Sequence, residues 1–138
     1  MNIFIFVSQE WLLITCLFAL IAALVAVTRK NNGLPIVAGE LVTLMNQDKA
    51  VLVDVRSAND FKQGHIHGSI NIPHNALASR TSELEKHKSS LIVLADQMGQ
   101  HAGTAGGLLT KQGYDIRRLS GGISQWKHSN LPLVSGKK

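Results

Sequence analysis

The pattern of apolar and polar residues divides the chain into two parts. Residues 11–28 carry no charge and, as a helix rising about 1.5 Å per residue, would extend about 27 Å. That length is close to the roughly 30 Å hydrocarbon core of a bilayer. We therefore predict a short N-terminal segment over 1–10, a transmembrane helix over 11–28 and a linker over 29–35.

Charges around the apolar segment bear on whether it is retained and how it is oriented. A signal peptide is one alternative, but it begins with basic residues, and no Lys or Arg precedes Arg29. A buried hairpin helix is another alternative. Arg29 and Lys30 follow the segment, and the positive-inside rule places such residues in the cytoplasm. We expect a single-pass protein of the bacterial inner membrane, with its N-terminus outside and its C-terminal domain in the cytoplasm.

Beyond the linker, apolar runs typical of buried strands alternate with helical patterns. Strands are expected over 50–55, 70–72, 91–95 and 116–119, and helices over 40–46, 75–88 (one or two broken helices), 102–112 and 121–126. Alternating strands and helices predict an α/β domain over 36–135, with a central parallel sheet flanked by helices and a basic tail over 136–138. Ligands of such sheets bind at the carboxyl ends of the strands.

The charges favour some partners over others. All 14 Lys and Arg residues and all but one of the nine acidic residues follow the apolar segment. The residues after this segment therefore carry a mild net positive charge, which favours weak contact with anionic lipid headgroups. No basic stripe with interleaved aromatic residues is present, so we expect no nucleic-acid binding. The single cysteine, Cys16, lies in the predicted membrane span, which leaves the soluble part without a thiol for a disulfide or metal site.

Two stretches of the domain resemble the signatures of a known family. VDVRSANDFKQGHIHGSINIP, residues 53–73, resembles the N-terminal signature of rhodanese-like domains, and GGISQW with the later LPL resembles the C-terminal one. The resemblance covers residues 35–134 and extends to the family's membrane-anchored, single-domain members. It implies a compact α/β fold whose active-site loop follows a central strand and surrounds one cysteine. That cysteine accepts sulfur as a persulfide, and loop amides stabilise the anion.

The candidate loop departs from the family pattern. It comprises Asp96, Gln97, Met98, Gly99, Gln100, His101 and Ala102. The family places its nucleophile three residues before a glycine and 17 before the glycine that ends the next helix. Counting back from Gly99 and from Gly113 gives Asp96 in both cases. His101 matches the usual loop arginine, and Ala102 matches the usual small hydroxyl residue.

Replacing a cysteine by Asp96 changes the chemistry that the loop can perform. A carboxylate cannot form a persulfide, whereas a thiolate can. A carboxylate can accept hydrogen bonds from loop amides and so act as a fixed anion. The alternatives are that Asp96 caps the following helix or faces water, or that it is a catalytic carboxylate such as an aspartyl-phosphate nucleophile. No second acid or metal ligand lies beside it in the sequence to support catalysis.

Other polar residues are expected to support the loop. Asp54 and Arg56 are two apart at a strand end and so point the same way; with Asp60 nearby they could form an ion-pair cluster. The resemblance implies that His65, in GHI, is polar scaffolding. His65, His67 and His74 suggest a metal site as the alternative, but a complete ligand set is not evident. We expect no metal and no cofactor.

These observations favour a non-catalytic function. We expect a binding or scaffolding module that presents its surface to a membrane-associated protein partner. The alternative class is an enzyme, which could be a sulfurtransferase that works with a partner's cysteine. It could also be a new activity built on Asp96 and His101.

Overall fold

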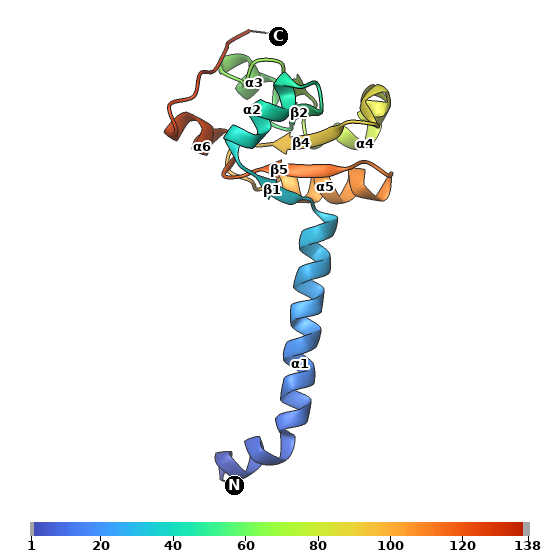
Figure 1. Cartoon of the computed structure of the whole chain (residues 1–138), viewed down its shortest axis with the longest axis vertical. Coiled ribbons are helices and arrows are strands. Elements are labelled where there is room, and N and C mark those ends of the chain that lie inside the picture. Colours follow the sequence, from blue (N-terminus) through green and yellow to red (C-terminus); the bar gives the residue numbers. More distant parts are fainter. Residues whose placement is uncertain (1, 137–138) are drawn as a thin grey trace. The chain divides into compact units, whose positions relative to one another are not determined.

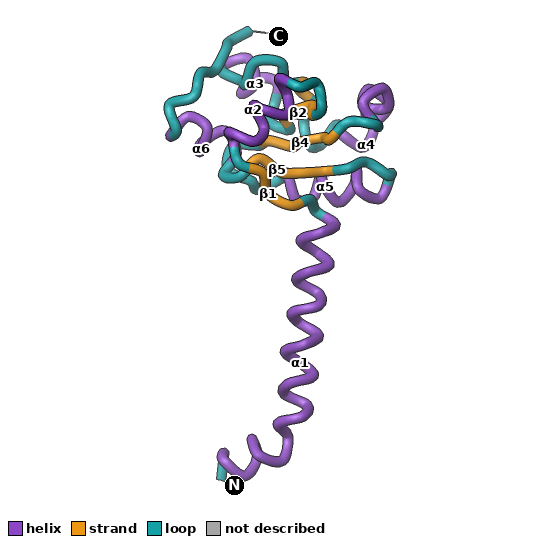
Figure 2. The backbone as a smooth tube through the Cα atoms, viewed as in Figure 1, coloured by secondary structure: helices purple, strands orange, loops and turns teal. Residues whose placement is uncertain are grey.

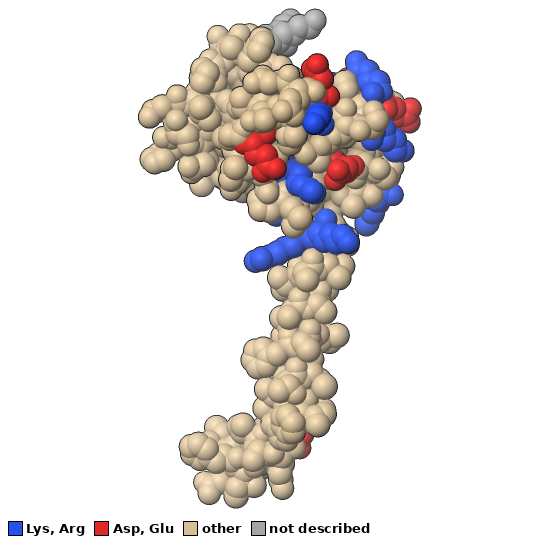
Figure 3. Space-filling model, in the orientation of Figure 1, with Lys and Arg blue, Asp and Glu red and all other residues tan. Residues whose placement is uncertain are grey.

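The computed structural model describes residues 2–136, and the chain divides into two compact units, Met1–Lys30 and Asn31–Lys138. The first unit is formed by α1 (Ile3–Asn31), which has no buried residue. This helix is long and apolar enough to cross a membrane, by length and composition alone. Its last turn carries Arg29 and Lys30, and most of its visible surface is uncharged (Figure 3).

The helix is longer than the sequence predicts. The predicted N-terminal segment over 1–10 is helical from Ile3 onward, because Ile3–Val7 contains no residue that breaks a helix. The predicted linker over 29–35 is also shorter, since α1 continues to Asn31 and a strand begins at Leu34. The basic tail predicted over 136–138 lies mostly outside the described residues.

The second unit contains a sheet of five parallel strands in the order β1-β5-β4-β2-β3. The strands are β1 (Leu34–Ile36), β2 (Ala50–Asp54), β3 (Ile70–Asn71), β4 (Leu91–Ala95) and β5 (Ile116–Leu119). Figure 2 shows the strands at the centre of this unit, surrounded by helices and loops. The predicted strands of the sheet are confirmed, with ends that differ by at most one residue.

Six helical elements connect and cover the strands. They are α2 (Ala38–Asn46), α3 (Ala58–Gln63), α4 (Leu77–Arg80), the 3-10 helix η1 (Thr81–His87), α5 (Ala102–Lys111) and α6 (Gly122–His128). The predicted broken helix over 75–88 is thus α4 followed by η1. The predicted α/β fold, a parallel sheet flanked by helices, is confirmed.

The core lies on both faces of the sheet. Ile92 and Leu94 of β4 join a cluster that includes Leu109 of α5. Val93 of the same strand points to the other face, where it packs in a cluster with Leu41 of α2 and with α6. Figure 1 shows α2 and α5 on opposite faces of the sheet. Both clusters are formed by residues of the second unit alone, so its core is complete without α1.

Strand β1 was not expected, because its sequence contains the helix-breaking residues typical of a linker. Leu34 pairs with Arg117 and Ile36 with Leu119, which adds a strand at the edge of the sheet. Arg118 Nε donates a hydrogen bond to the carbonyl oxygen of Gly33 over 2.8 Å. This pairing partner lies more than 80 residues away in the sequence, so local composition does not reveal it.

Candidate functional site

The candidate loop begins where β4, the middle strand of the sheet, ends. Asp96 follows Ala95 directly and is only 2% exposed. One carboxylate oxygen accepts a hydrogen bond from the backbone N–H of Gly99. The other accepts from the backbone N–H of His101 over 2.5 Å and of Ala102 over 3.2 Å. The carboxylate therefore lies in a cradle of three amides, two of them at the N-terminus of α5, where the helix dipole also favours an anion.

The last helix holds the start of this loop in place. The backbone N–H of Ile123 donates to the carbonyl oxygen of Asp96 over 2.8 Å, and that of Ser124 donates to the carbonyl of Gln97 over 3.0 Å. Gly122 is in the left-handed region with φ of 63°, and a Cβ there would clash with both of these carbonyl groups. A glycine at this position is therefore required for α6 to contact the loop.

The tip of the loop is open to solvent. Met98 is 65% exposed, and Gln97, Gln100 and His101 are exposed as well. The His101 ring stacks on His74, with ring centroids 3.9 Å apart and planes within 1° of parallel. The buried anion of Asp96 is thus covered by a loop that presents the Met98 side chain and the His101 imidazole, which stacks on His74 from outside the loop.

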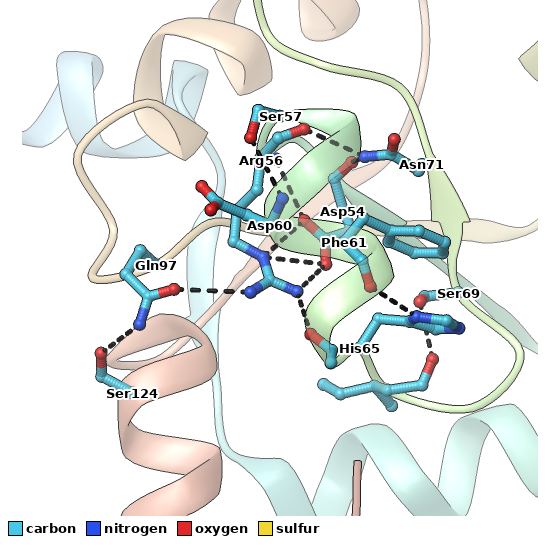
Figure 4. A network of polar contacts seen from close by, with 12 residues as sticks. Asp54, Arg56, Ser57, Asp60, Phe61, His65, Ser69, Asn71, Gln97 and Ser124 are labelled. Atoms are coloured by element: carbon cyan, nitrogen blue, oxygen red, sulfur yellow. Dashed lines mark hydrogen bonds and ion pairs between the residues drawn. The ribbon is translucent and has the colours of Figure 1, made fainter. Parts of the chain in front are cut away.

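Asp54 and Arg56 form a buried ion pair beside the loop (Figure 4). Arg56 Nη2 lies 2.7 Å from Asp54 Oδ2, and Arg56 Nε donates to both carboxylate oxygens over 3.0 and 3.1 Å. Asn71 supports the strand end by donating from Nδ2 to the backbone carbonyls of both residues. The prediction that these two side chains point the same way is confirmed.

Arg56 also connects the ion pair to the loop. Its Nη2 donates to the carbonyl of Gly64 over 2.7 Å, and its Nη1 donates to Gln97 Oε1 over 3.4 Å. Gln97 Nε2 in turn donates to Ser124 Oγ over 3.0 Å. The donors of the guanidinium are therefore largely engaged by the protein itself, as expected of a residue that positions its neighbours. Gly64 and Ser124 lie in the two signature stretches quoted above, but the sequence did not predict that Gly64 contacts Arg56 or that Ser124 contacts Gln97.

Asp60 does not take part in this cluster, so that element of the prediction is wrong. Ser57 caps α3, because its Oγ accepts a hydrogen bond from the backbone N–H of Asp60 over 3.2 Å. The Asp60 residue itself is exposed. Arg56 turns instead toward Asp54 and Gly64. Three residues separate β2 from α3, and Asp60 lies in the first turn of α3, exposed to solvent.

His65 lies in the interior, fully buried. Its Nδ1 is 2.8 Å from the carbonyl oxygen of Phe61, and because a carbonyl can only accept, Nδ1 carries the proton. The ring stacks on Phe61 with centroids 3.7 Å apart, and the His65 backbone exchanges two hydrogen bonds with Val134. This arrangement ties α3 to the C-terminal segment.

The three histidines considered as metal ligands lie in different surroundings. His65 is buried, His67 is exposed, and His74 stacks on His101. Within residues 2–136, no three His, Cys, Asp or Glu side chains are grouped so that they could hold a metal ion. The absence of a bound metal remains a prediction.

These features define a class of domain: a parallel α/β fold whose central strand leads into an amide-lined loop able to hold an anion. Comparison with known proteins identifies the family. The model of the rhodanese-like domain matches residues 37–129, and the chain belongs to this family.

Its relatives include chains that match it over nearly their whole length. The chain is 37% identical to the protein YibN of Escherichia coli (strain K12) over 137 residues, which covers 96% of each chain. It is 33% identical to the protein BU052 of Buchnera aphidicola over 142 residues, or 99% of each chain.

Solved structures share the fold of the second unit. A rhodanese-related protein from Thermoplasma volcanium is 27% identical, with a TM-score of 0.67 over 73% of this chain and 97% of that chain. Nearly all of that crystallised chain is therefore the matched domain. A thiosulfate sulfurtransferase from Pseudomonas aeruginosa, 20% identical with a TM-score of 0.69 over 78% of this chain and 21% of its own, shows the same fold.

Proposed function

We propose that the chain is a membrane-anchored rhodanese-like module that binds a membrane-associated protein and does not itself transfer sulfur. The observation that carries this proposal is that the Asp96 carboxylate occupies the amide cradle. It accepts hydrogen bonds from the backbone N–H groups of Gly99, His101 and Ala102. The family resemblance implies that this cradle otherwise stabilises a cysteine persulfide.

The residues available argue against sulfur transfer by this domain. Residues 31–138 contain no cysteine, and Cys16 lies in α1. A carboxylate oxygen cannot replace the soft sulfur nucleophile that attacks sulfane sulfur. Asp96 also stands at the nucleophile's place by its spacing from Gly99 and from Gly113.

The same arrangement disfavours an anionic substrate in the cradle. The three amides already donate to a buried carboxylate, so a second anion would find no free donor there. It would also meet the negative charge of Asp96 at close range, in a site with little solvent to screen the repulsion. The loop is therefore stabilised from within, and its exposed tip around Met98 is available to a protein partner.

The charges support the location we propose for this partner. Arg29 and Lys30 at the end of α1 favour the bacterial inner membrane with the domain in the cytoplasm. On the visible face of the domain, basic and acidic side chains are interspersed (Figure 3). The net charge of +5 supports weak contact with anionic lipids, whereas the acidic residues interspersed among the basic ones argue against a nucleic-acid surface.

Sulfur transfer is tested with the purified domain, residues 31–138, supplied with thiosulfate and cyanide. We expect no thiocyanate above a heat-inactivated control. Asp96→Cys should place a thiol among the cradle amides, where it reacts rapidly with a thiol probe. Adding His101→Arg and Ala102→Ser should restore the groups expected to orient a sulfur donor and so favour turnover. Thiocyanate formation by the wild type, or an unreactive thiol in Asp96→Cys, would contradict the proposal.

Binding is tested with the full chain in its membrane. Proteins crosslinked to the wild type are compared with those crosslinked to Met98→Asp at the loop tip, with Val42→Asp on α2 as the control. A partner of the loop should be lost with Met98→Asp and kept with Val42→Asp. Equal capture by both variants would show that the loop tip is not the binding surface.

A further inference from the structure

A groove of about 630 Å³ lies between α3, β3 and α4. None of the residues that line it belongs to the loop over 96–102, so it is separate from the site already described. Its volume falls within the range of pockets that hold small molecules, about 300–1,000 Å³. The groove is therefore large enough for a ligand of its own.

Apolar atoms form most of the groove surface. Phe61, a residue only 4% exposed, contributes from α3, and Ile70 contributes from β3, packed against the core. Ala58, at the start of α3, adds a small side chain to the lining. Part of this lining belongs to packed side chains that cannot turn away to fill the space.

Basic side chains from two helices join this apolar lining. Lys62 comes from α3 and Arg80 from α4, and His67 lines the groove as well, whereas no Asp or Glu does. Lys62 is exposed, and it has no ion-pair partner among the residues that the structure describes. The groove thus combines an apolar surface with positive charge that is not neutralised within its lining.

Arg80 is partly engaged by a neighbour outside the groove. Its Nε and Nη2 contact the Glu83 carboxylate over 2.5 and 3.1 Å, and both side chains are about half exposed. This hydrogen bond lowers the pKa of Glu83, so the pair stays ionised near neutral pH. Among residues 2–136 no hydrogen bond engages Arg80 Nη1, so this group can donate to a ligand, although Glu83 would compete with an incoming acid.

We propose that this groove binds an amphipathic organic anion: an aromatic or acyl body that carries a single carboxylate, sulfonate or phosphate. The body would lie on Phe61 and Ile70, and the acidic group would lie between Lys62 and Arg80. The apolar contact supplies affinity, and the two cations select a ligand with an acidic end.

Two fluorescent probes that share an aromatic body test this proposal. 1-Anilinonaphthalene-8-sulfonate carries one sulfonate, and N-phenyl-1-naphthylamine is its neutral counterpart. With the purified domain, residues 31–138, we expect the sulfonate to bind saturably at one site and more tightly than the neutral probe. The core of this domain is complete without α1, and the absence of α1 removes its apolar surface as a competing site for the probes.

Variants locate the site. Lys62→Glu with Arg80→Glu should weaken binding of the sulfonate about tenfold, while binding of the neutral probe changes little. Ala58→Trp should block both probes by filling the groove. Glu83→Gln should tighten binding of the sulfonate because it releases Arg80. The matched control is Lys127→Glu, an exposed lysine of α6 outside the groove, which should leave both affinities unchanged.

Three results would overturn the proposal, given that circular dichroism shows each variant to be folded. The first is equal affinity for the two probes. The second is an unchanged affinity of the sulfonate in the double charge reversal, and the third is unchanged binding of both in Ala58→Trp. Since the groove and the loop share no residue, these outcomes are independent of the sulfur-transfer assay.

Discussion

The carboxylate of Asp96 accepts a hydrogen bond from the backbone N–H of Ala102, the first residue of α5, over 3.2 Å. A single side chain thereby connects the end of the central strand to the beginning of the helix that follows it. Helix N-termini leave backbone N–H groups without partners, and a buried one must find an acceptor. Asp96 supplies that acceptor, so the conformation of the loop depends on the negative charge of this one carboxylate.

Asp96→Asn should therefore destabilise the domain. The amide keeps one acceptor oxygen but directs an NH₂ group toward amide donors, and the loss of charge-assisted hydrogen bonds costs about 1–3 kcal/mol. Urea unfolding of residues 31–138 measures the change. Asp115→Asn is the control, because that side chain is 68% exposed and its contact with Arg117 is 3.7 Å long. Equal stability of wild type and Asp96→Asn would show that the charge does not hold the loop.

Arg56→Ala should have a larger effect. Asp54 is 1% exposed, so removal of Arg56 leaves a buried carboxylate without its counter-ion, at a cost of about 3–5 kcal/mol. Arg56→Lys keeps the charge but not the forked geometry, and we expect an intermediate loss of stability. Arg80→Ala removes an exposed pair and should change the unfolding midpoint far less. Equal unfolding midpoints for Arg56→Ala and Arg80→Ala would show that the buried ion pair stabilises the domain no more than the exposed one.

Gly106→Ala should reduce stability although alanine is the better helix former. A Cβ at this position would clash with the backbone carbonyl of Asn32, which lies against α5. Such overpacking costs about 1–3 kcal/mol. Gly39→Ala is the matched control in α2, since a Cβ there has nothing within 4 Å. Thermal unfolding should show a lower midpoint for the first variant only; a rise in both would mean that Asn32 does not pack on α5.

The orientation of α1 can be measured in cells. Because Arg29 and Lys30 follow the apolar span, a periplasmic phosphatase fused after Lys138 should be inactive. Protease added to spheroplasts should leave the domain intact and should degrade it after lysis. An active phosphatase fusion would reverse the orientation and place the domain outside the cytoplasm.

The purified domain should carry no stoichiometric zinc, copper or nickel. His65 uses Nδ1 within the core, and His67 has no second and third ligand beside it among the described residues. Elemental analysis of residues 31–138 measures the content, with His67→Ala as the comparison. Metal near one equivalent that disappears in His67→Ala would show that a site has been overlooked.

Much of the fold could be predicted because its signals are local. The uncharged span predicts α1, and the short apolar runs predict strands such as β4, whose ends match the structure. Asp54 and Arg56 could be paired in advance because side chains two apart in a strand share one side. The spacing from Gly99 and from Gly113 also predicts that Asp96 begins the candidate loop.

Other features arise only when distant segments meet. Strand β1 exists because Leu34–Ile36 pairs with β5, and no local pattern distinguishes those residues from a linker. The role of Gly122 depends on the approach of α6 to the carbonyl of Asp96, and Gln97 reaches Ser124 across 27 residues of sequence. Local sequence determines which elements form and which residues carry charge. Only tertiary packing decides which amides surround Asp96 and which side chains line the groove beside β3, because both depend on segments that the chain brings together from far apart.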